Sequence, residues 1–169
     1  MIRRVKKGQG LTMVELVITL AIIACLATLM MPGLGRWLSH YRIKSTAGDI
    51  ASCFRLAQMA AVQRNQTASV RFNTNNGSVE VLDGGGATIR TIVLSQYKAQ
   101  FNGLDFVDQG GDGIISITYN TRGIPSDEAG NPIGVPGGQN GERVFLKNNR
   151  GEGYWVEVSP VGNVRYDRV

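Results

Sequence analysis

Three aspartates in one short stretch are the residues whose type and spacing suggest metal chemistry. They are Asp105, Asp108 and Asp112, within the segment DFVDQGGDG. Carboxylate oxygens are good ligands for Ca²⁺, but their spacing here differs from that of the EF-hand loop. The pattern therefore favours a polar turn and leaves a Ca²⁺ site as the alternative.

Other arrangements that could carry catalysis are weak. The run of three glycines after Asp83 is not followed by the lysine and hydroxyl residue of a phosphate-binding loop. His40 is the one histidine, and no group of cysteines or acidic residues lies near it in the sequence, so it cannot complete a serine triad in the later part of the chain. We expect a protein that is not an enzyme and needs no cofactor.

A single carboxylate inside an apolar run is the most unusual feature of the sequence. Residues 11–31 are 21 positions with one charged side chain, Glu15. A helix of that length would be about 32 Å long, enough for the roughly 30 Å hydrocarbon core of a bilayer. A charge at the centre of such a span costs about 2.5–3.5 kcal/mol, so Glu15, even near one end, is expected to have a positively charged partner.

Basic residues precede this run and explain most of the net charge. Arg3, Arg4, Lys6 and Lys7 are four of the 18 basic residues. Such flanks stay on the cytoplasmic side, so the rest of the chain is expected across the membrane. Without these four, 14 basic residues face 13 acidic ones, so the remaining chain is almost neutral. That balance does not favour nucleic-acid binding, which depends on many phosphate contacts.

The basic leader together with Gly10, Leu11, Glu15 and Pro32 resembles the N-terminal segment of type IV prepilins. The resemblance implies that a prepilin peptidase cuts after Gly10 and methylates the new N-terminus, Leu11, where phenylalanine or methionine is more usual. It implies that Glu15, at mature position five, pairs with the N-terminal amine of a neighbouring subunit during assembly. It also implies that Pro32 kinks the helix.

The segment after an interruption at residues 32–35 predicts an amphipathic helix. Apolar side chains recur there at three- and four-residue steps, at Ile43, Ala47, Ile50, Phe54, Ala57 and Ala61. We expect this stripe to pack on the domain that follows. Cys25 and Cys53 would be about 42 Å apart on one continuous helix, so we interpret both as small apolar residues without a disulfide between them.

From residue 67 the apolar period changes to two, which predicts strands at residues 68–73, 78–82, 88–94, 114–119, 143–147, 154–159 and 163–166. Asn76-Gly77 and Val161-Gly162 indicate hairpin turns, and residues 125–141 predict a long exposed loop. The expected fold is α+β, with a long N-terminal helix, half membrane-spanning and half amphipathic, packed on a C-terminal antiparallel sheet. The expected boundaries are a leader at 1–10, a membrane or filament-core helix at 11–31, an amphipathic helix at 32–66 and a β-rich domain at 67–169.

Two further segments resemble the GspH/FimT family of minor pilins and type II secretion pseudopilins. Residues 56–64, LAQMAAVQR, resemble its helix that leads into a strand, with Gln58 where arginine is usual, and residues 156–165, VEVSPVGNVR, resemble its closing strand pair. The resemblance implies a subunit that helps to initiate or cap a type II secretion pseudopilus or a type IV pilus. It implies a bacterial inner-membrane anchor, a cytoplasmic N-terminus, a periplasmic head and a place at the filament tip. Implied partners are other pilins or pseudopilins, the prepilin peptidase, the inner-membrane assembly platform and the lipid bilayer; some related pseudopilins bind Ca²⁺.

Two alternative functions stay open. Some FimT-like minor pilins bind DNA through a C-terminal Gly-Arg-x-Arg motif, and this chain has Gly162-Asn163-Val164-Arg165, without the first arginine. Arg165 and Arg168 are the candidate DNA-binding residues, with Asp167 between them reducing the local positive charge. The other alternative is a periplasmic domain on a plain signal anchor, which a polar cluster inside a pocket of the domain would favour.

Overall fold

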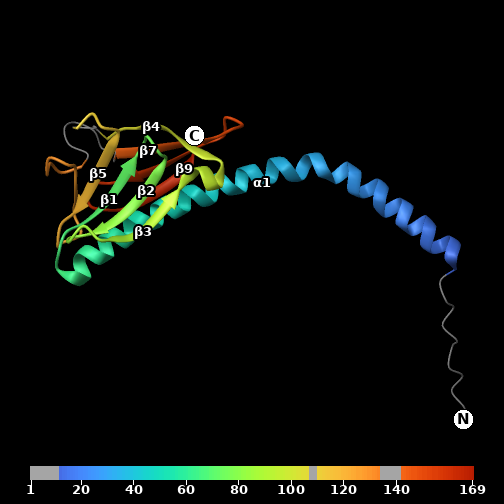
Figure 1. Cartoon of the computed structure of the whole chain (residues 1–169), viewed down its shortest axis with the longest axis horizontal. Coiled ribbons are helices and arrows are strands. Elements are labelled where there is room, and N and C mark those ends of the chain that lie inside the picture. The colour runs from blue at the N-terminus through green and yellow to red at the C-terminus, as the bar shows by residue number, and fades with distance from the viewer. Residues whose placement is uncertain (1–11, 107–109, 134–141) are drawn as a thin grey trace, which may run out of the picture. The chain divides into compact units, whose positions relative to one another are not determined.

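A computed structural model describes residues 12–106, 110–133 and 142–169, with the backbone alone at residues 29–34. The chain divides into two compact units, Met1–Leu38 and Ser39–Val169, and the second is called the head below. One helix, α1 (Met13–Arg64), contributes to both (Figure 1). The predicted interruption at residues 32–35 is therefore wrong, because α1 continues through Pro32. A proline inside a helix removes one hydrogen bond and distorts the helix, but it does not have to end it.

The start of α1 is defined by a capping residue. Thr12 stands directly before the helix, and its Oγ1 accepts a hydrogen bond from the backbone N–H of Glu15 (3.2 Å). Threonine followed three residues later by glutamate is the capping-box pattern, which satisfies N–H groups that have no partner in the first turn. A carboxylate in that turn also interacts favourably with the helix dipole. Glu15 therefore occupies a position that suits the local helix.

The amphipathic stripe predicted for the second half of α1 is confirmed. All six of its members have no exposed surface: Ile43, Ala47, Ile50, Phe54, Ala57 and Ala61. Ala51, Cys53 and the polar Thr46 are equally buried. Thr46 does not leave an unsatisfied hydroxyl, since its Oγ1 donates a hydrogen bond to the carbonyl of Arg42 (2.9 Å). This half of the helix is thus an integral part of the core of the head, and burying each large apolar side chain contributes about 1.5–3 kcal/mol.

The first sheet is antiparallel and has the strand order β3-β2-β1-β5-β6. Its strands are β1 (Ala68–Asn73), β2 (Ser78–Asp83), β3 (Thr88–Val93), β5 (Ile114–Tyr119) and β6 (Pro125–Ser126). The β1–β2 pair is the predicted Asn-Gly hairpin, with Val70 opposite Val81. Strand β5 comes from much later in the chain and pairs with the other side of β1, with Ile117 opposite Val70.

The second sheet is also antiparallel and has the order β4-β7-β8-β9. Its strands are β4 (Ala99–Leu104), β7 (Glu142–Asn148), β8 (Gly153–Val158) and β9 (Val164–Arg168), and a short 3₁₀ helix, η1 (Leu94–Tyr97), precedes β4. The predicted closing strand pair is confirmed as β8–β9, with Val156 opposite Tyr166. The predicted α+β class is therefore confirmed, but the strands form two sheets (Figure 1).

Four phenylalanines join α1 to both sheets. The ring of Phe72, on β1, lies 5.6 Å from that of Phe54 on α1 and 6.1 Å from that of Phe101 on β4. Phe106, just after β4, stacks on Phe72 with ring centroids 6.2 Å apart. Tilted and offset aromatic pairs of this kind add about 0.5–1.5 kcal/mol each to the burial of their area. The core of the head thus includes helix, first sheet and second sheet.

Candidate functional site

The N-terminal half of α1 presents an apolar surface. Nine of its large apolar side chains are at least half exposed: Met13, Val14, Leu16, Val17, Ile18, Leu20, Ile22, Ile23 and Leu26. The hydroxyls of Thr19 and Thr28 donate to the carbonyls of Leu16 and Cys25, both at 2.8 Å. A helix that is apolar all round requires an apolar environment, and inside such an environment its hydroxyls must be satisfied within the helix. The hydroxyls of Thr19 and Thr28 meet the second condition.

Glu15 is the acidic group of this surface. Its side chain is exposed, and within the described part of the chain no hydrogen bond or ion pair is formed by the carboxylate. Gly10 and Leu11, the predicted processing residues, lie outside the described residues. Pro32 lies inside α1, where the backbone alone is described. Over residues 12–106, 110–133 and 142–169, no helix combines the length and the apolar character needed to cross a membrane.

Two of the three aspartates of the candidate metal site, Asp105 and Asp112, lie in the described residues. Asp112 Oδ1 accepts a hydrogen bond from the backbone N–H of Ile114 (2.9 Å), and its carbonyl accepts one from Asn75 Nδ2 (2.7 Å). Asp105 donates its backbone N–H to the carbonyl of Arg143 (2.9 Å), and Asp108 lies outside the described residues. Within the described ranges no group of three His, Cys, Asp or Glu side chains is placed to hold a metal ion.

The two candidate DNA-binding arginines do not share a face of β9. They are three residues apart on one strand, and side chains alternate between the faces of a strand, so Arg165 and Arg168 point to opposite sides. Glu157 is the residue opposite Arg165 on β8, and Asp167 lies on the same face two residues along. A concentrated basic surface is therefore not formed by this pair.

His40 and its surroundings mark the point where α1 enters the head. Its Nε2 lies 3.3 Å from the hydroxyl of Tyr154, and the two rings are 5.8 Å apart. Next to it, Ser39 Oγ accepts a hydrogen bond from Nδ2 of the buried Asn148 (3.1 Å), which also donates to Glu152 Oε2 (2.7 Å). His40 is therefore a packing residue of the head.

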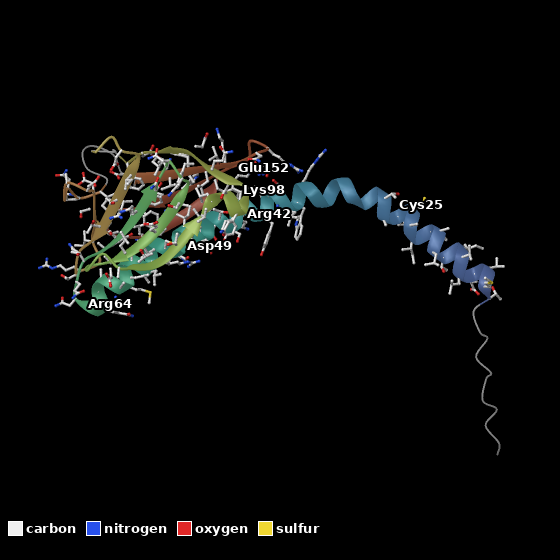
Figure 2. The ribbon with its side chains drawn as sticks, in the orientation of Figure 1. Cys25, Arg42, Asp49, Arg64, Lys98 and Glu152 are labelled. Atoms are coloured by element: carbon white, nitrogen blue, oxygen red, sulfur yellow. The ribbon has the colours of Figure 1, made fainter. Side chains whose placement is uncertain are left out.

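Ion pairs attach α1 to the first sheet along its length. Asp49 accepts a hydrogen bond from Arg90 of β3 at 3.2 Å, and Arg64 donates to Asp83 at the end of β2 at 2.9 Å. Figure 2 labels Asp49 and Arg64 on the ribbon of α1. On the second sheet, Arg143 donates to Glu157 at 2.7 Å, and its guanidinium lies 5.0 Å from the ring centre of Trp155. These pairs are partly exposed, so each contributes about 1 kcal/mol or less.

Burial raises the pKa of two titratable side chains in the core of the head. Desolvation raises the pKa of the Cys53 thiol to about 11, and the charge of Arg90 opposes this in part. Desolvation also raises the pKa of the Tyr119 phenol far above its usual value. Cys25 is exposed and Cys53 is buried, and both are free thiols. Neither buried group is placed for chemistry; both behave as core residues.

Sequence reasoning missed a junction formed around Gln58. Gln58 Nε2 donates a hydrogen bond to the carbonyl of Gly123 (3.0 Å), in the turn between β5 and β6. Gly162, in the β8–β9 turn, lies so close that a Cβ there would be 2.5 Å from Gln58 Nε2 and 3.0 Å from the Gly123 carbonyl oxygen. The one signal in the sequence was Gln58 itself, which stands where the resembling family usually has arginine.

The chain is similar to one family of known proteins and to two solved structures. The model of the family "Type II transport protein GspH" matches residues 46–162, from the second half of α1 to the β8–β9 turn. Two crystal structures of the type IV minor pilin FimU of Pseudomonas aeruginosa (strain PAO1) are similar to the chain at 12% identity. One has a TM-score of 0.47 and covers 73% of this chain and 91% of that one; for the other the values are 0.48, 78% and 92%. No curated protein has a sequence that matches the chain. Because the family model spans more than half of the 169 residues, the chain belongs to the GspH family of pseudopilins and minor pilins.

Proposed function

We propose that the chain is a minor subunit that is anchored in the inner membrane through residues 11–31 and helps to initiate or cap a filament. A structural role in a pilus or pseudopilus follows from the family. The observation that carries the finer proposal is Glu15, whose carboxylate has no partner among the described residues and lies at the first turn of an exposed apolar helix segment. In a membrane or a helix bundle such a group needs a cation.

The cation we propose is the N-terminal amine that cleavage after Gly10 would create. The new N-terminus, Leu11, precedes the capping residue Thr12 directly, and Glu15 is four residues further along. The amine of one subunit would pair with Glu15 of its neighbour when the apolar helices pack side by side. The prepilin peptidase, the assembly platform and the bilayer are the partners that this sequence of events requires.

Intact mass tests the processing step. The full chain is expressed with and without a prepilin peptidase, and the mass of the membrane-bound product is measured. We expect the enzyme to remove residues 1–10 and to add one methyl group to Leu11. An unchanged mass, or cleavage beyond residue 31, would contradict the proposal and leave a periplasmic domain on an ordinary anchor or secretory signal.

Substitution of Glu15 tests the assembly step. Glu15→Ala should lower incorporation into filaments at least tenfold, because the neighbour's amine loses its partner at a cost of about 1.4 kcal/mol or more. Glu128→Ala, which removes an exposed carboxylate in the head, is the matched control and should incorporate normally. Equal incorporation of Glu15→Ala and the parent chain would refute the pairing.

The DNA-uptake alternative receives no support from the arrangement of its arginines, which point to opposite faces of β9. It keeps a direct test. Duplex-DNA affinity of the full chain is compared with that of the variant carrying Arg165→Ala and Arg168→Ala. We expect the two affinities to be equally weak, whereas tight binding by the parent chain that both substitutions abolish would establish DNA as a ligand.

A further inference from the structure

Four exposed apolar side chains lie where α1 ends in the head. They come from three separate segments: Met59 and Val62 from α1, Ile124 from the β5–β6 turn and Val161 from the β8–β9 turn. Their exposed fractions are 55%, 51%, 42% and 70%. We call this set the pole patch. Arg64, labelled in Figure 2, marks this end of the helix.

The contacts around Gln58 hold the three segments together. A Cβ on Gly123 would be 3.1 Å from Gln58 Cγ and 3.2 Å from Val62 Cγ2, so the β5–β6 turn rests directly on α1. Gly162 is in contact with Gln58 and with the carbonyl of Gly123. Ile124 and Val161 are the chain neighbours of these two glycines. The three segments that carry the pole patch are therefore held together at the end of α1 by the contacts of Gln58.

The turns that carry the patch are tightly constrained. The N–H of Gly123 donates to the carbonyl of Asn120 (2.8 Å), and the N–H of Gly162 donates to the carbonyl of Ser159 (2.8 Å). Both glycines have positive φ angles, +75° and +83°. Little conformational freedom is lost when a partner covers side chains on such turns, and binding is stronger when that cost is small.

Two arginines flank the residues of the pole patch in the sequence, and Asp127 and Glu128 follow β6. Arg55 lies one turn before Met59 on α1, with its Nη2 3.4 Å from the carbonyl of Val164, and Arg122 directly precedes Gly123. Within the described part of the chain neither arginine is in an ion pair. The nearest acidic residue along this segment, Asp127, accepts hydrogen bonds within its own turn, from Asn131. An apolar centre with arginines at its edge matches an apolar surface edged by carboxylates.

The two arginines favour some binding partners of the pole patch over others. Two copies of this chain meeting symmetrically through the patch would bring the arginines at the edge of one patch near those of the other, which is unfavourable. Anionic membranes attract clusters of about four to eight basic residues, and two adjoin this patch. We propose that the pole patch binds a different subunit of the same filament, one that presents an apolar surface edged by aspartate or glutamate. This inference rests on the function proposed above and adds the surface and the kind of partner.

Site-specific photocross-linking tests the proposal in the full chain. p-Benzoylphenylalanine replaces Val161 in one variant, Val17 of the apolar helix segment in a second and the exposed Thr91 of β3 in a third, which is the surface control. Each is expressed together with the other filament subunits of the same bacterium, one subunit at a time. We expect position 161 to cross-link one other subunit, through a peptide that contains Asp or Glu, at least tenfold more than position 91.

Reversing the charges of the two arginines is the second part of the experiment. Arg55→Glu with Arg122→Glu should reduce the cross-link from position 161 about tenfold, while Arg55→Lys with Arg122→Lys should retain it. Insensitivity to reversal, adducts with a second copy of this chain, or adducts with lipid would overturn the proposal. So would the absence of any adduct at position 161 while position 17 cross-links other subunits. Failure of both positions would overturn the filament function itself.

Discussion

Replacing Gly162 by alanine tests the junction that supports the pole patch. Gly162 has φ +83°, and a Cβ there would approach Gln58 Nε2 to 2.5 Å and the Gly123 carbonyl oxygen to 3.0 Å. The left-handed backbone costs about 1–2 kcal/mol for a residue with a Cβ. The clash adds a further 1–3 kcal/mol, roughly, because two packed groups must move. We therefore expect Gly162→Ala to lower the free energy of unfolding by about 2–5 kcal/mol.

Gly86→Ala separates the two contributions. Gly86 has nearly the same φ, +81°, but a Cβ there would meet nothing within 4 Å. Its substitution should cost the backbone part alone, about 1–2 kcal/mol. The difference between the two variants, about 1–3 kcal/mol, measures the contact with α1. For a chain of this size that difference corresponds to about 2–12 °C in Tm.

Thermal unfolding of the full chain in detergent, followed by tryptophan fluorescence, provides the assay. A Trp37→Phe background leaves Trp155 of β8 as the reporter, since the chain has two tryptophans. Gln58→Ala in the Gly162→Ala background removes the closest atom and should recover at least 1 kcal/mol, roughly, of the loss in a double-mutant cycle. Equal destabilisation by Gly162→Ala and Gly86→Ala would refute the packing described for the junction.

Four other predictions concern the core and the second sheet. Near pH 8 a thiol reagent should modify Cys53 of a Cys25→Ser variant much more slowly in the folded chain than in urea, because burial and the raised pKa of about 11 leave little Cys53 thiolate; equal rates in the two states would contradict the burial. Since the folded pKa of Cys53 exceeds the ordinary value of 9.0, its contribution to stability is complete below pH 9 and is lost as the pH rises to 11, at about 1.4 kcal/mol per pH unit; a Cys53→Ala variant titrated with denaturant should lack this part of the loss. Tyr119→Phe should leave stability unchanged or raise it by about 1 kcal/mol, because the buried hydroxyl has no partner among the described residues, and a clear loss in urea unfolding would show that a partner exists. A double-mutant cycle of Arg143→Ala and Glu157→Ala should give a coupling of about 0.5–1 kcal/mol that weakens in 1 M salt, whereas a coupling insensitive to salt would argue against an ionic interaction.

The spacing of apolar residues was sufficient to predict the elements of the head in which buried and exposed side chains alternate regularly. The stripe on α1 and the limits of β1 and β5 agree with their sequence predictions, because one face of each is completely buried and the apolar residues repeat with the period of the element. β4 was missed because a register shift between Phe101 and Gly103 breaks the alternation and polar or small residues fill the positions between. β6 has two residues, the first a proline, which gives no pattern at all.

The division into two sheets and the pole patch depend on contacts between distant parts of the chain. β5 pairs with β1 although about 40 residues separate the two strands in the sequence, and the residues of either strand do not predict which strand it pairs with. Ile124 and Val161 each stand in an ordinary turn, and they become part of one surface through Gln58, which is more than 60 residues from both. The interruption predicted at residues 32–35 failed for a different reason: proline and glycine disfavour a helix locally, but a long helix with strong segments on both sides continues through them.

The attachment of α1 within the head has a mechanical consequence. The buried stripe from Ile43 to Ala61 extends about 27 Å along the helix axis, and Asp49 and Arg64 fix the helix to the first sheet at two separate levels. A load applied along the axis of α1 acts on all of these contacts in shear and at the same time. They cannot be peeled apart one after another, so the force needed to extract the helix is set by their sum. The head is thereby suited to stay attached to its helix while that helix is pulled.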